Sequence, residues 1–299
     1  MLRARKSCRS LVVSSWNTQI TERIDRPDSI CILRPTRRRD LNRNIFYIVL
    51  RGAAVIRPIE FHLPIVSSTN DYARELLRSY PYVWVSAQHQ TAGRGRKGRQ
   101  WLGDFGANIY ASLGIRHSLD VPVEELSAFM ARGALAVIRV IRQHAPNIEA
   151  RIKYPNDVQV RTPDGWSKIA GILVEHEFQG NRCLSTILGI GINVEQVGFP
   201  DTIGQRCTSL RLLDIPANPS VLITELRDLL SDLMSTPWPE IHAKWVDELS
   251  RGIRRMRIEG DSASWSFVRV LPDGRLILKN EVTQIERTIS DGDTVRYED

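Results

Sequence analysis

The segment Gly93–Arg99, with the sequence GRGRKGR, constrains the fold of this chain more than any other stretch. Its glycines match the G-x-G-x-x-G spacing of a dinucleotide-binding loop, which has to open directly into a helix. The residues that follow are QWLGDFGANIYASLGIR, which hold further glycines and then alternate like a strand. Because a helix cannot start there, the sequence excludes a doubly wound dinucleotide-binding domain at this point.

The same segment still has the chemistry of an anion-binding loop. Its arginines offer forked donors and its glycines leave the backbone N–H groups unhindered, so it predicts a loop that closes over a phosphate-bearing ligand. A solvated basic turn or an RGG-like contact to RNA are the alternatives, since glycine motifs this short are weak signals.

The hydrophobic periodicity predicts an α+β fold. Alternating strand patterns and amphipathic helix patterns follow one another from Ile59 onward, and Asp164-Gly165 signals a tight turn between two of the strands. We expect a mixed, mainly antiparallel sheet flanked by helices. A short strand is expected within 59–70, ahead of a helix at 68–80. Further strands are expected at 82–90, 107–116, 150–160, 168–178 and 183–194, and further helices at 123–144, 218–234 and 238–250.

Three regions are expected along the chain. Residues 1–57 form a basic extension without a sustained period, typical of a disordered tail, and residues 58–250 form the main domain. Residues 251–299 have short alternating runs with turns at Asp273-Gly274 and Asp291-Gly292, so they predict a small β module of the size of an SH3-like barrel.

The charge is concentrated in the N-terminal region. The net charge is +7, but residues 1–58 hold 13 Lys or Arg against 4 Asp or Glu, while the remaining 241 residues hold 28 basic and 30 acidic side chains. Nucleic-acid binding through the main domain is therefore not indicated.

The apolar runs and the cysteines indicate the cellular location. The longest apolar run, IFYIVL, is too short to cross a bilayer, so we expect no membrane association. The four cysteines (Cys8, Cys31, Cys183 and Cys207) show no C-x-x-C pair and no histidine at zinc-ligand spacing. We expect neither a metal site nor disulfides, and a cytoplasmic location. An organelle transit peptide at the basic N-terminus is the alternative.

Six motifs occur along the main domain in one order: SSTN, HQTAGRGRKGRQW, FGANIYASL, RIKYPND, SKIAGILVE and LGIGINV. In this order and spacing they closely resemble the biotin–protein ligases, from about Ile59 to Ser250 and weakly through the C-terminal module. The resemblance implies the biotin/lipoate ligase catalytic fold, which is similar to that of class II synthetases. It also implies ATP with Mg²⁺ as co-substrate, biotin as substrate, and as partner the biotin carboxyl carrier protein or domain of acetyl-CoA carboxylase or another biotin-dependent carboxylase.

The biotin side of the implied site begins at the S-T-N motif. Ser68, Thr69 and Asn70 match it and would hydrogen-bond the ureido ring of biotin, and Gln90 matches the biotin-contacting glutamine of the family. From the residues alone, a helix cap is the simpler explanation of Ser68, and it is compatible with a biotin contact. The alternative for Gln90 is a surface strand residue.

The charged part of the implied site combines the glycine loop with one strand lysine. Arg94, Gly95 and Arg96 match the ligand-ordered loop of the family, with the arginines near the biotin carboxylate and the nucleotide phosphates. Lys168 matches the lysine of the K-x-A-G-I-L motif, and with Arg94 and Arg96 it is our candidate electrostatic catalyst. A lone lysine at a strand start is otherwise solvated in most proteins.

Four other residues are assigned to the nucleotide side of the implied site. Asn156 and Asp157 of the KYPND motif would line it, and Asn193 matches the adenine-contacting asparagine of the family. Trp101 is either a loop anchor or an aromatic flank of the nucleotide pocket. Turn chemistry explains Asn156 and Asp157 equally well, and a buried sheet-end amide explains Asn193.

The reaction implied by the resemblance has two steps. The biotin carboxylate attacks the α-phosphate of ATP to give biotinyl-5′-adenylate and pyrophosphate, and a lysine of the carrier protein then takes the biotinyl group. Two anions approach each other in the first step, so cationic side chains would stabilise its transition state. Asp157 is a candidate base for the acceptor lysine.

The sequence departs from the family in three places. Tyr154 stands where the motif usually has Trp, and residues 1–58 lack the helix-turn-helix periodicity of bifunctional members, so no specific DNA binding is expected. The C-terminal module matches the family only in size and strand pattern. We expect a monomer or a weak homodimer.

Two rival interpretations remain. A lipoate–protein ligase or acyltransferase shares the catalytic fold but lacks the GRGRKGR loop in this form. A nucleic-acid-binding protein would use the basic tail and the loop, and its affinity would fall steeply with salt. It gives no account of the KIAGILVE and GIGIN motifs.

Overall fold

The computed structural model describes residues 18–20, 31–35, 47–50, 53–118, 120–200, 203–251, 255–290 and 292–298. The chain divides by its internal contacts into two units, residues 1–59 and 60–299. The first unit contains an antiparallel sheet of order β1-β2-β3-β4. Its strands are β1 (Thr18–Ile20), β2 (Cys31–Pro35), β3 (Tyr47–Leu50) and β4 (Ala53–Ile56). They lie where the sequence predicts no regular structure, and the rest of that prediction concerns residues outside the described ranges.

A seven-stranded sheet forms the centre of the second unit, with the order β5-β6-β7-β11-β10-β9-β8. From β6 to β8 each neighbouring pair is antiparallel. The sheet therefore confirms the mixed, mainly antiparallel arrangement that the periodicity predicts. Its strands are β5 (Ile59–Val66), β6 (Tyr82–Gln90), β7 (Asn108–Arg116), β8 (Ala150–Lys153), β9 (Asp157–Thr162), β10 (Gly165–Gln179) and β11 (Arg182–Asn193).

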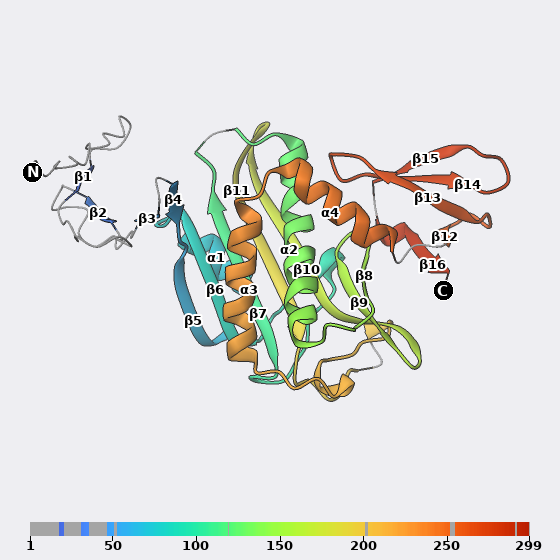
Figure 1. Cartoon of the computed structure of the whole chain (residues 1–299), viewed down its shortest axis with the longest axis horizontal. Helices are drawn as coiled ribbons and strands as arrows, with labels where there is room; N and C mark the ends of the chain where they lie inside the picture. The colour runs from blue at the N-terminus through green and yellow to red at the C-terminus, as the bar shows by residue number, and fades with distance from the viewer. Residues whose placement is uncertain are drawn as a thin grey trace, which may run out of the picture. The chain divides into compact units, whose positions relative to one another are not determined.

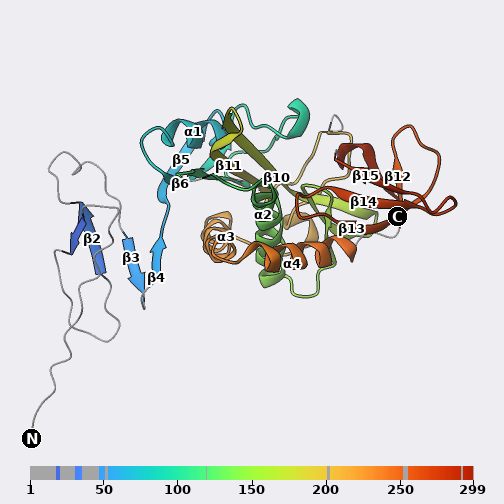
Figure 2. The same ribbon diagram turned by 90° about the horizontal axis from the view of Figure 1, so that it is seen from above.

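Helices cover both faces of this sheet. The long helix α2 (Val123–His144) lies against one face together with α3 (Pro219–Met234) and α4 (Trp238–Ser250), as Figure 1 shows, while the short helix α1 (Thr69–Leu76) lies on the opposite face (Figure 2). The described helices begin and end within a few residues of their predicted bounds. None of them combines the length and the hydropathy that a membrane span requires.

Strand β11 shows how the sequence pattern separates the two faces. Leu188, Ile190 and Ile192 belong to the large core under α2, while Ile187 packs in the smaller cluster under α1. Since alternate residues of a strand point to opposite faces, the positions on the α1 face between these core residues are free to serve a ligand. Glycines occupy two of them, at 189 and 191.

A separate five-stranded antiparallel sheet forms the C-terminal module, in the order β15-β14-β13-β12-β16. The sheet is consistent with the predicted SH3-like barrel. Its strands are β12 (Arg255–Ile258), β13 (Trp265–Val270), β14 (Leu276–Asn280), β15 (Glu286–Ile289) and β16 (Val295–Glu298). Short 3₁₀ turns occur at η2 (Arg96–Gly98), η4 (Arg211–Leu213) and η5 (Gly292–Thr294).

The module contacts the turn between β8 and β9. The backbone N–H of Tyr154 donates to the hydroxyl of Tyr297 at 2.8 Å, and the hydroxyl of Tyr154 donates to the carbonyl of Gly274 at 2.9 Å. A Cβ at Gly292 would come within 2.7 Å of the Tyr154 ring, so the two parts approach closely. The module therefore supports the turn that carries Asn156 and Asp157.

Candidate active site

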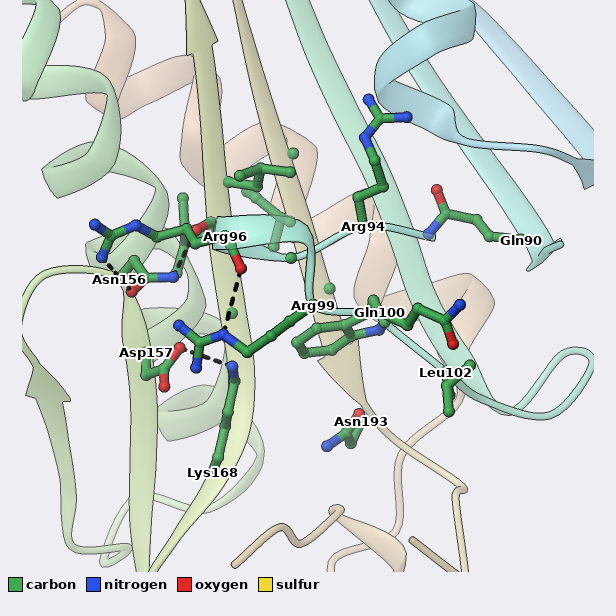
Figure 3. A pocket seen from close by; sticks show the side chains of 18 of the residues that line it. Gln90, Arg94, Arg96, Arg99, Gln100, Leu102, Asn156, Asp157, Lys168 and Asn193 are labelled. Atoms are coloured by element: carbon green, nitrogen blue, oxygen red, sulfur yellow. Dashed lines mark hydrogen bonds and ion pairs between the residues drawn. The ribbon is translucent and has the colours of Figure 1, made fainter. Parts of the chain in front are cut away.

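A cavity of about 350 Å³ opens on the α1 face of the seven-stranded sheet. Side chains from both of its sides and from the glycine loop above it are shown in Figure 3. All twelve residues that the sequence singles out line this cavity: Ser68, Thr69, Asn70, Gln90, Arg94, Gly95, Arg96, Trp101, Asn156, Asp157, Lys168 and Asn193. The fold thus brings together segments that lie more than 120 residues apart in the chain.

The N-terminus of α1 forms one end of the cavity. Ser68 caps the helix, because its hydroxyl accepts a hydrogen bond from the Asp71 N–H at 3.4 Å, as the sequence predicts. Thr69 donates to the side-chain oxygen of Gln90 from its backbone N–H at 2.7 Å and from its hydroxyl at 3.0 Å. Ser68, Thr69 and Asn70 are all at least 95% buried, so this end is a dry surface of converging amide and hydroxyl groups.

Ser112 on β7 contacts two of these residues. Its hydroxyl lies 2.8 Å from the hydroxyl of Thr69 and 2.6 Å from the side-chain oxygen of Asn70. The side-chain N–H of Asn70 donates to Glu175 at 2.7 Å. A carboxylate can only accept, so the orientation of the Asn70 amide is fixed by its neighbours.

Glycines form the floor of the cavity, and the Trp101 ring lies on them. A Cβ at Gly191 would come 2.5 Å from the ring, and one at Gly171 would come 2.8 Å from it. Glycine in a strand interior marks a close approach of another group, and here that group is the indole. The indole N–H of Trp101 is buried without a hydrogen-bond partner among the described residues, which leaves a donor inside the cavity.

Lys168 and Asp157 form a buried ion pair at the opposite end. The Lys168 ammonium lies 2.7 Å from the Asp157 carboxylate, and their side chains are 13% and 10% exposed. The pairing of β9 with β10 is irregular between Lys168 and Ala170. The same ammonium lies 5.2 Å from the centre of the Trp101 ring. Lys168 therefore differs from an ordinary solvated lysine at a strand start.

Arg96 and Asn156 stand above this ion pair. A guanidinium N–H of Arg96 donates to the Asn156 side-chain oxygen at 3.3 Å, and the Asn156 amide donates to the Ile172 carbonyl at 3.0 Å. Arg99, which also lines the cavity, donates to the Arg96 carbonyl at 3.3 Å. Figure 3 shows Arg96, Asn156, Asp157 and Lys168 together on one side.

A further lysine strengthens the positive potential at this end. Burial lowers the pKa of Lys153, the nearby Asp157 raises it, and the charges of Lys168, Arg296 and Arg99 lower it further. Several cations thus surround the Asp157 carboxylate. Such an arrangement suits a polyanion such as a nucleoside triphosphate. Arg296 belongs to β16, so the C-terminal module adds to this potential.

Arg94 takes a different direction from Arg96. Its guanidinium pairs with both carboxylate oxygens of Asp71 and lies 3.4 Å from Glu175. The hydrogen bond from Arg94 lowers the pKa of Asp71, with Arg74 adding to the effect. In Figure 3 the Arg94 side chain extends away from Lys168 and Arg96. The sequence predicts that Arg94, Arg96 and Lys168 lie together. In the structure only Arg96 and Lys168 do so, and Arg99 lies beside them.

Asn193 closes the side of the cavity near the chain segment that follows β11. Its amide donates to the Thr208 carbonyl at 3.0 Å and the residue is 3% exposed. The Lys168 N–H donates to the Arg206 carbonyl at 2.9 Å, and the Thr208 N–H donates back to the Lys168 carbonyl at 2.8 Å. The segment 206–208 therefore holds both Asn193 and Lys168 in place.

The sequence prediction missed several residues of the site. Arg99 lies within the GRGRKGR segment, and the glycines at 189 and 191 have the two-residue spacing of one strand face, so both could have been found. Ser112 and Glu175, which contact Asn70, carry no local signal, because they lie far from it in sequence: Asn70 and Glu175 are 105 positions apart.

Comparisons with known proteins agree with the motifs. The model of the Biotin/lipoate A/B protein ligase family matches residues 62–193. The bifunctional ligase/repressor BirA of Bacillus spizizenii is 37% identical over 150 residues, 49% of this chain and 44% of that protein. The biotin--[acetyl-CoA-carboxylase] ligase of Mycobacterium tuberculosis is 33% identical over 226 residues, 71% of this chain and 78% of that protein.

The solved structures support the same fold. Biotin protein ligase from Aquifex aeolicus in complex with biotin and ATP aligns with a TM-score of 0.63 at 22% identity, over 80% of this chain and 99% of that one. The chain spans less than half the length of the Bacillus relatives that it matches, which are 44% covered. Its 33% identity with a ligase of which it covers 78% shows that the chain belongs to the biotin–protein ligase family.

Proposed function

We propose that this chain is an ATP-dependent biotin–protein ligase, which forms biotinyl-5′-adenylate and then transfers biotin to a lysine of a biotin carboxyl carrier protein or domain. The observation that carries the proposal is the division of one cavity into two ends, with buried neutral donors at the α1 end and a buried lysine with arginines at the other. A substrate with a neutral polar ring and an anionic tail is complementary to such a cavity.

The α1 end suits the ureido ring of biotin. A urea presents one carbonyl acceptor and two N–H donors, and Ser68, Thr69, Asn70 and Gln90 offer hydroxyl and amide groups of both kinds within one dry surface. Beside the Trp101 indole, which covers the glycine floor, the cavity leaves room for the fused bicyclic ring of biotin beneath the loop. The Trp101 indole, stacked on that floor, supplies an apolar wall and a spare N–H.

The cationic end suits the reacting groups. In the first step a carboxylate oxygen of biotin bonds to the α-phosphorus of ATP, the bond from that phosphorus to the bridging oxygen breaks, and pyrophosphate leaves. Lys168 and Arg96 would hold the two anions together and stabilise the added negative charge in the transition state. Because Lys168 is already buried and paired with Asp157, little reorganisation would be needed when the nucleotide binds.

Magnesium would accompany the nucleotide as MgATP. In proteins this ion is commonly held by one or two carboxylates together with substrate phosphates and water. The sequence predicts no metal site built by the protein alone, so the phosphates would be the main ligands of the ion. The Asp157 carboxylate lies on the cavity wall, paired with Lys168, and would be the side chain to join them.

In the second step the amine of the acceptor lysine bonds to the acyl carbon, AMP leaves, and one proton must be removed. Lysine amines are mostly protonated at neutral pH, so a base is required, and Asp157 is our candidate. Asn156 and Asn193 would hold the adenosine part meanwhile. As acceptor we propose the carrier domain of acetyl-CoA carboxylase or another biotin-dependent carboxylase. A cytoplasmic location, the absence of specific DNA binding, and a monomer or weak homodimer complete the proposal.

Release of pyrophosphate by the purified protein tests the adenylation half-reaction. With MgATP we expect release that depends on biotin, and no release with lipoate. Release with lipoate in place of biotin would assign the chain to the other branch of its family. Biotin-independent release, or none with either acid, would contradict the proposed activity.

A further inference from the structure

Arg94 is the loop arginine whose partners do not fit the role of a substrate ligand. Both of its terminal nitrogens are engaged by the Asp71 carboxylate, and one of them also approaches Glu175 at 3.4 Å. These partners lie on α1 and β10, and neither of them lines the cavity. Pairing with Asp71 and Glu175 raises the pKa of the Arg94 guanidinium, as expected for a cation held by two carboxylates.

Glu175 receives donors from both sides of the site. Its Oε2 accepts from the Asn70 amide at 2.7 Å and lies 3.1 Å from Arg74, while its Oε1 faces Arg94. Arg74 also pairs with Asp71 at 2.6 Å. Two carboxylates and two arginines thus form one network, and Asn70 connects this network to the pocket at the N-terminus of α1.

The glycine loop is folded back on itself beyond Arg94. Arg94 forms a β-bridge with Gln100, the Gly95 N–H donates to the Arg99 carbonyl at 2.6 Å, and the Trp101 N–H donates to the Gly93 carbonyl at 2.9 Å. These bonds lie within the loop, so they do not by themselves hold it over the cavity. The Arg94 side chain supplies a connection from this hairpin to α1 and β10.

We propose that Arg94, Asp71 and Glu175 are positioning residues that anchor the glycine loop over the substrate pocket, and that Arg94 does not bind the substrate anions. The proposal rests on the proposed function and changes the role that the family resemblance implies for Arg94. Arg96 and Lys168 neutralise the negative charge of the biotin carboxylate and the phosphates. Since Glu175 also fixes Asn70, the same carboxylate sets the pocket wall and the loop above it.

Two substitutions remove the anchor without changing shape: Asp71→Asn and Glu175→Gln. Each removes a charge that holds Arg94, and Glu175→Gln keeps a side-chain oxygen that can accept from the Asn70 amide. The matched control is Glu60→Gln, because Glu60 is also about 30% exposed and pairs with an arginine, Arg227, at 2.7 Å, but outside the cavity. None of these changes creates or removes a trypsin site, so the loop can be probed by tryptic cleavage at Arg96 and Lys97.

In ligand-free protein, the two anchor variants are expected to be cut in the loop several times faster than the wild type and the Glu60→Gln variant. In pyrophosphate release, they are expected to raise KM for biotin about 3- to 10-fold at nearly unchanged kcat, the size expected for losing partly exposed ion pairs. Arg96→Met should instead lower kcat, because Arg96 acts on the reacting groups. A loss of kcat at unchanged KM in Glu175→Gln, or loop cleavage at the wild-type rate in both variants, would overturn the anchor.

The proteolysis measurement needs no turnover, so it also separates the two proposals. A wild-type protein without biotin-dependent pyrophosphate release but with anchor-dependent loop cleavage would overturn the proposed function alone. An active wild type whose anchor variants behave like Glu60→Gln in both measurements would overturn the anchor alone.

Discussion

At the scale of single residues, the candidate site depends on side chains whose surroundings change their chemistry. Lys168 is held beside Asp157 with little exposure to water, and Trp101 is held flat on a glycine floor. Neither environment is visible in a local sequence window. The glycine floor arises because β10 and β11 place Gly171 in register with Gly191. The ion pair arises because β9 runs beside β10 and places Asp157 opposite Gly171, within reach of Lys168.

Replacing Lys168 tests the electrostatic part of the mechanism. We expect Lys168→Met to lower kcat of pyrophosphate release about 10²- to 10³-fold, the effect of removing one preorganised group that stabilises developing charge. The variant also leaves the Asp157 carboxylate buried without its partner, at a cost of about 3–5 kcal/mol in stability. In the double variant Lys168→Met/Asp157→Asn, stability should recover and activity should not; recovery of activity as well would contradict the role of Lys168.

Replacing Gly191 tests the floor of the cavity. A Cβ there would come 2.5 Å from the Trp101 ring, so Gly191→Ala should displace the indole. We expect KM for biotin to rise at least about tenfold and the free energy of unfolding to fall by about 1–3 kcal/mol, as in other overpacked sites. Gly198→Ala is the control, since a Cβ at Gly198 would meet no atom within 4 Å. Equal KM values for the two variants would argue against contact between Trp101 and the substrate site.

At the scale of elements, α1 serves both the fold and the site. Its cap residue Ser68 is also a pocket residue, and the helix buries Ala73 under the smaller core cluster. The two explanations of Ser68 that the sequence leaves open are therefore compatible, and they can be separated by substitution.

Ser68→Ala and Ser68→Asp distinguish the cap from the ligand contact. Alanine removes the cap and should cost about 1 kcal/mol of stability, whereas aspartate preserves it. Aspartate, however, brings a negative charge to a surface that we assign to a neutral ureido ring. We expect chemical denaturation to show a loss only for Ser68→Ala, and biotin titration to show weaker binding for both. Undiminished biotin binding by Ser68→Asp would leave Ser68 as a cap alone.

The elements themselves were largely predictable from sequence, and the site was predictable in part. Alternation identified strands such as 82–90 and helical periodicity identified 123–144, because each element buries one face. The motifs identified twelve cavity residues. The direction of the Arg94 side chain was not predictable, because it is set by Asp71 and Glu175, which fold topology brings together from two different elements.

At the scale of the whole molecule, the C-terminal module is coupled to the site through Tyr154. Tyr297→Phe removes the hydroxyl that accepts from the buried Tyr154 N–H at 2.8 Å. An unsatisfied buried amide costs about 1–3 kcal/mol, so we expect thermal or chemical unfolding to show a loss of that size. The β8–β9 turn should also loosen and KM for ATP should rise. A stability equal to that of a Tyr80→Phe control would contradict this coupling.

The stability of the molecule should also depend on pH through two histidines. His117 and His176 both contact the buried Thr186 hydroxyl, at 2.8 and 2.9 Å. Burial lowers the pKa of His176 to about 4, with the charge of His117 adding to the effect, and burial lowers the pKa of His117 as well.

Between the usual histidine pKa of about 6.5 and about 4, the unfolded chain therefore binds more protons than the folded one. The free energy of unfolding should fall as pH decreases through this window, and these groups should add no pH dependence above it. Denaturant titrations at several pH values should show that the free energy of unfolding falls less steeply for His176→Asn than for the wild type. His62→Asn is the control and should behave like the wild type, because the His62 side chain is 59% exposed. The same slope in all three would contradict burial of a neutral His176.

We infer that this chain joins biotin to a protein lysine. The most direct test is intact mass spectrometry of a purified biotin carboxyl carrier domain after incubation with the protein, MgATP and an equal mixture of biotin and lipoate. We predict a single biotinyl addition to the carrier, absent when its acceptor lysine is replaced by arginine and absent with the Lys168→Met variant. A lipoyl addition, or an unmodified carrier with folded wild-type protein, would contradict this activity.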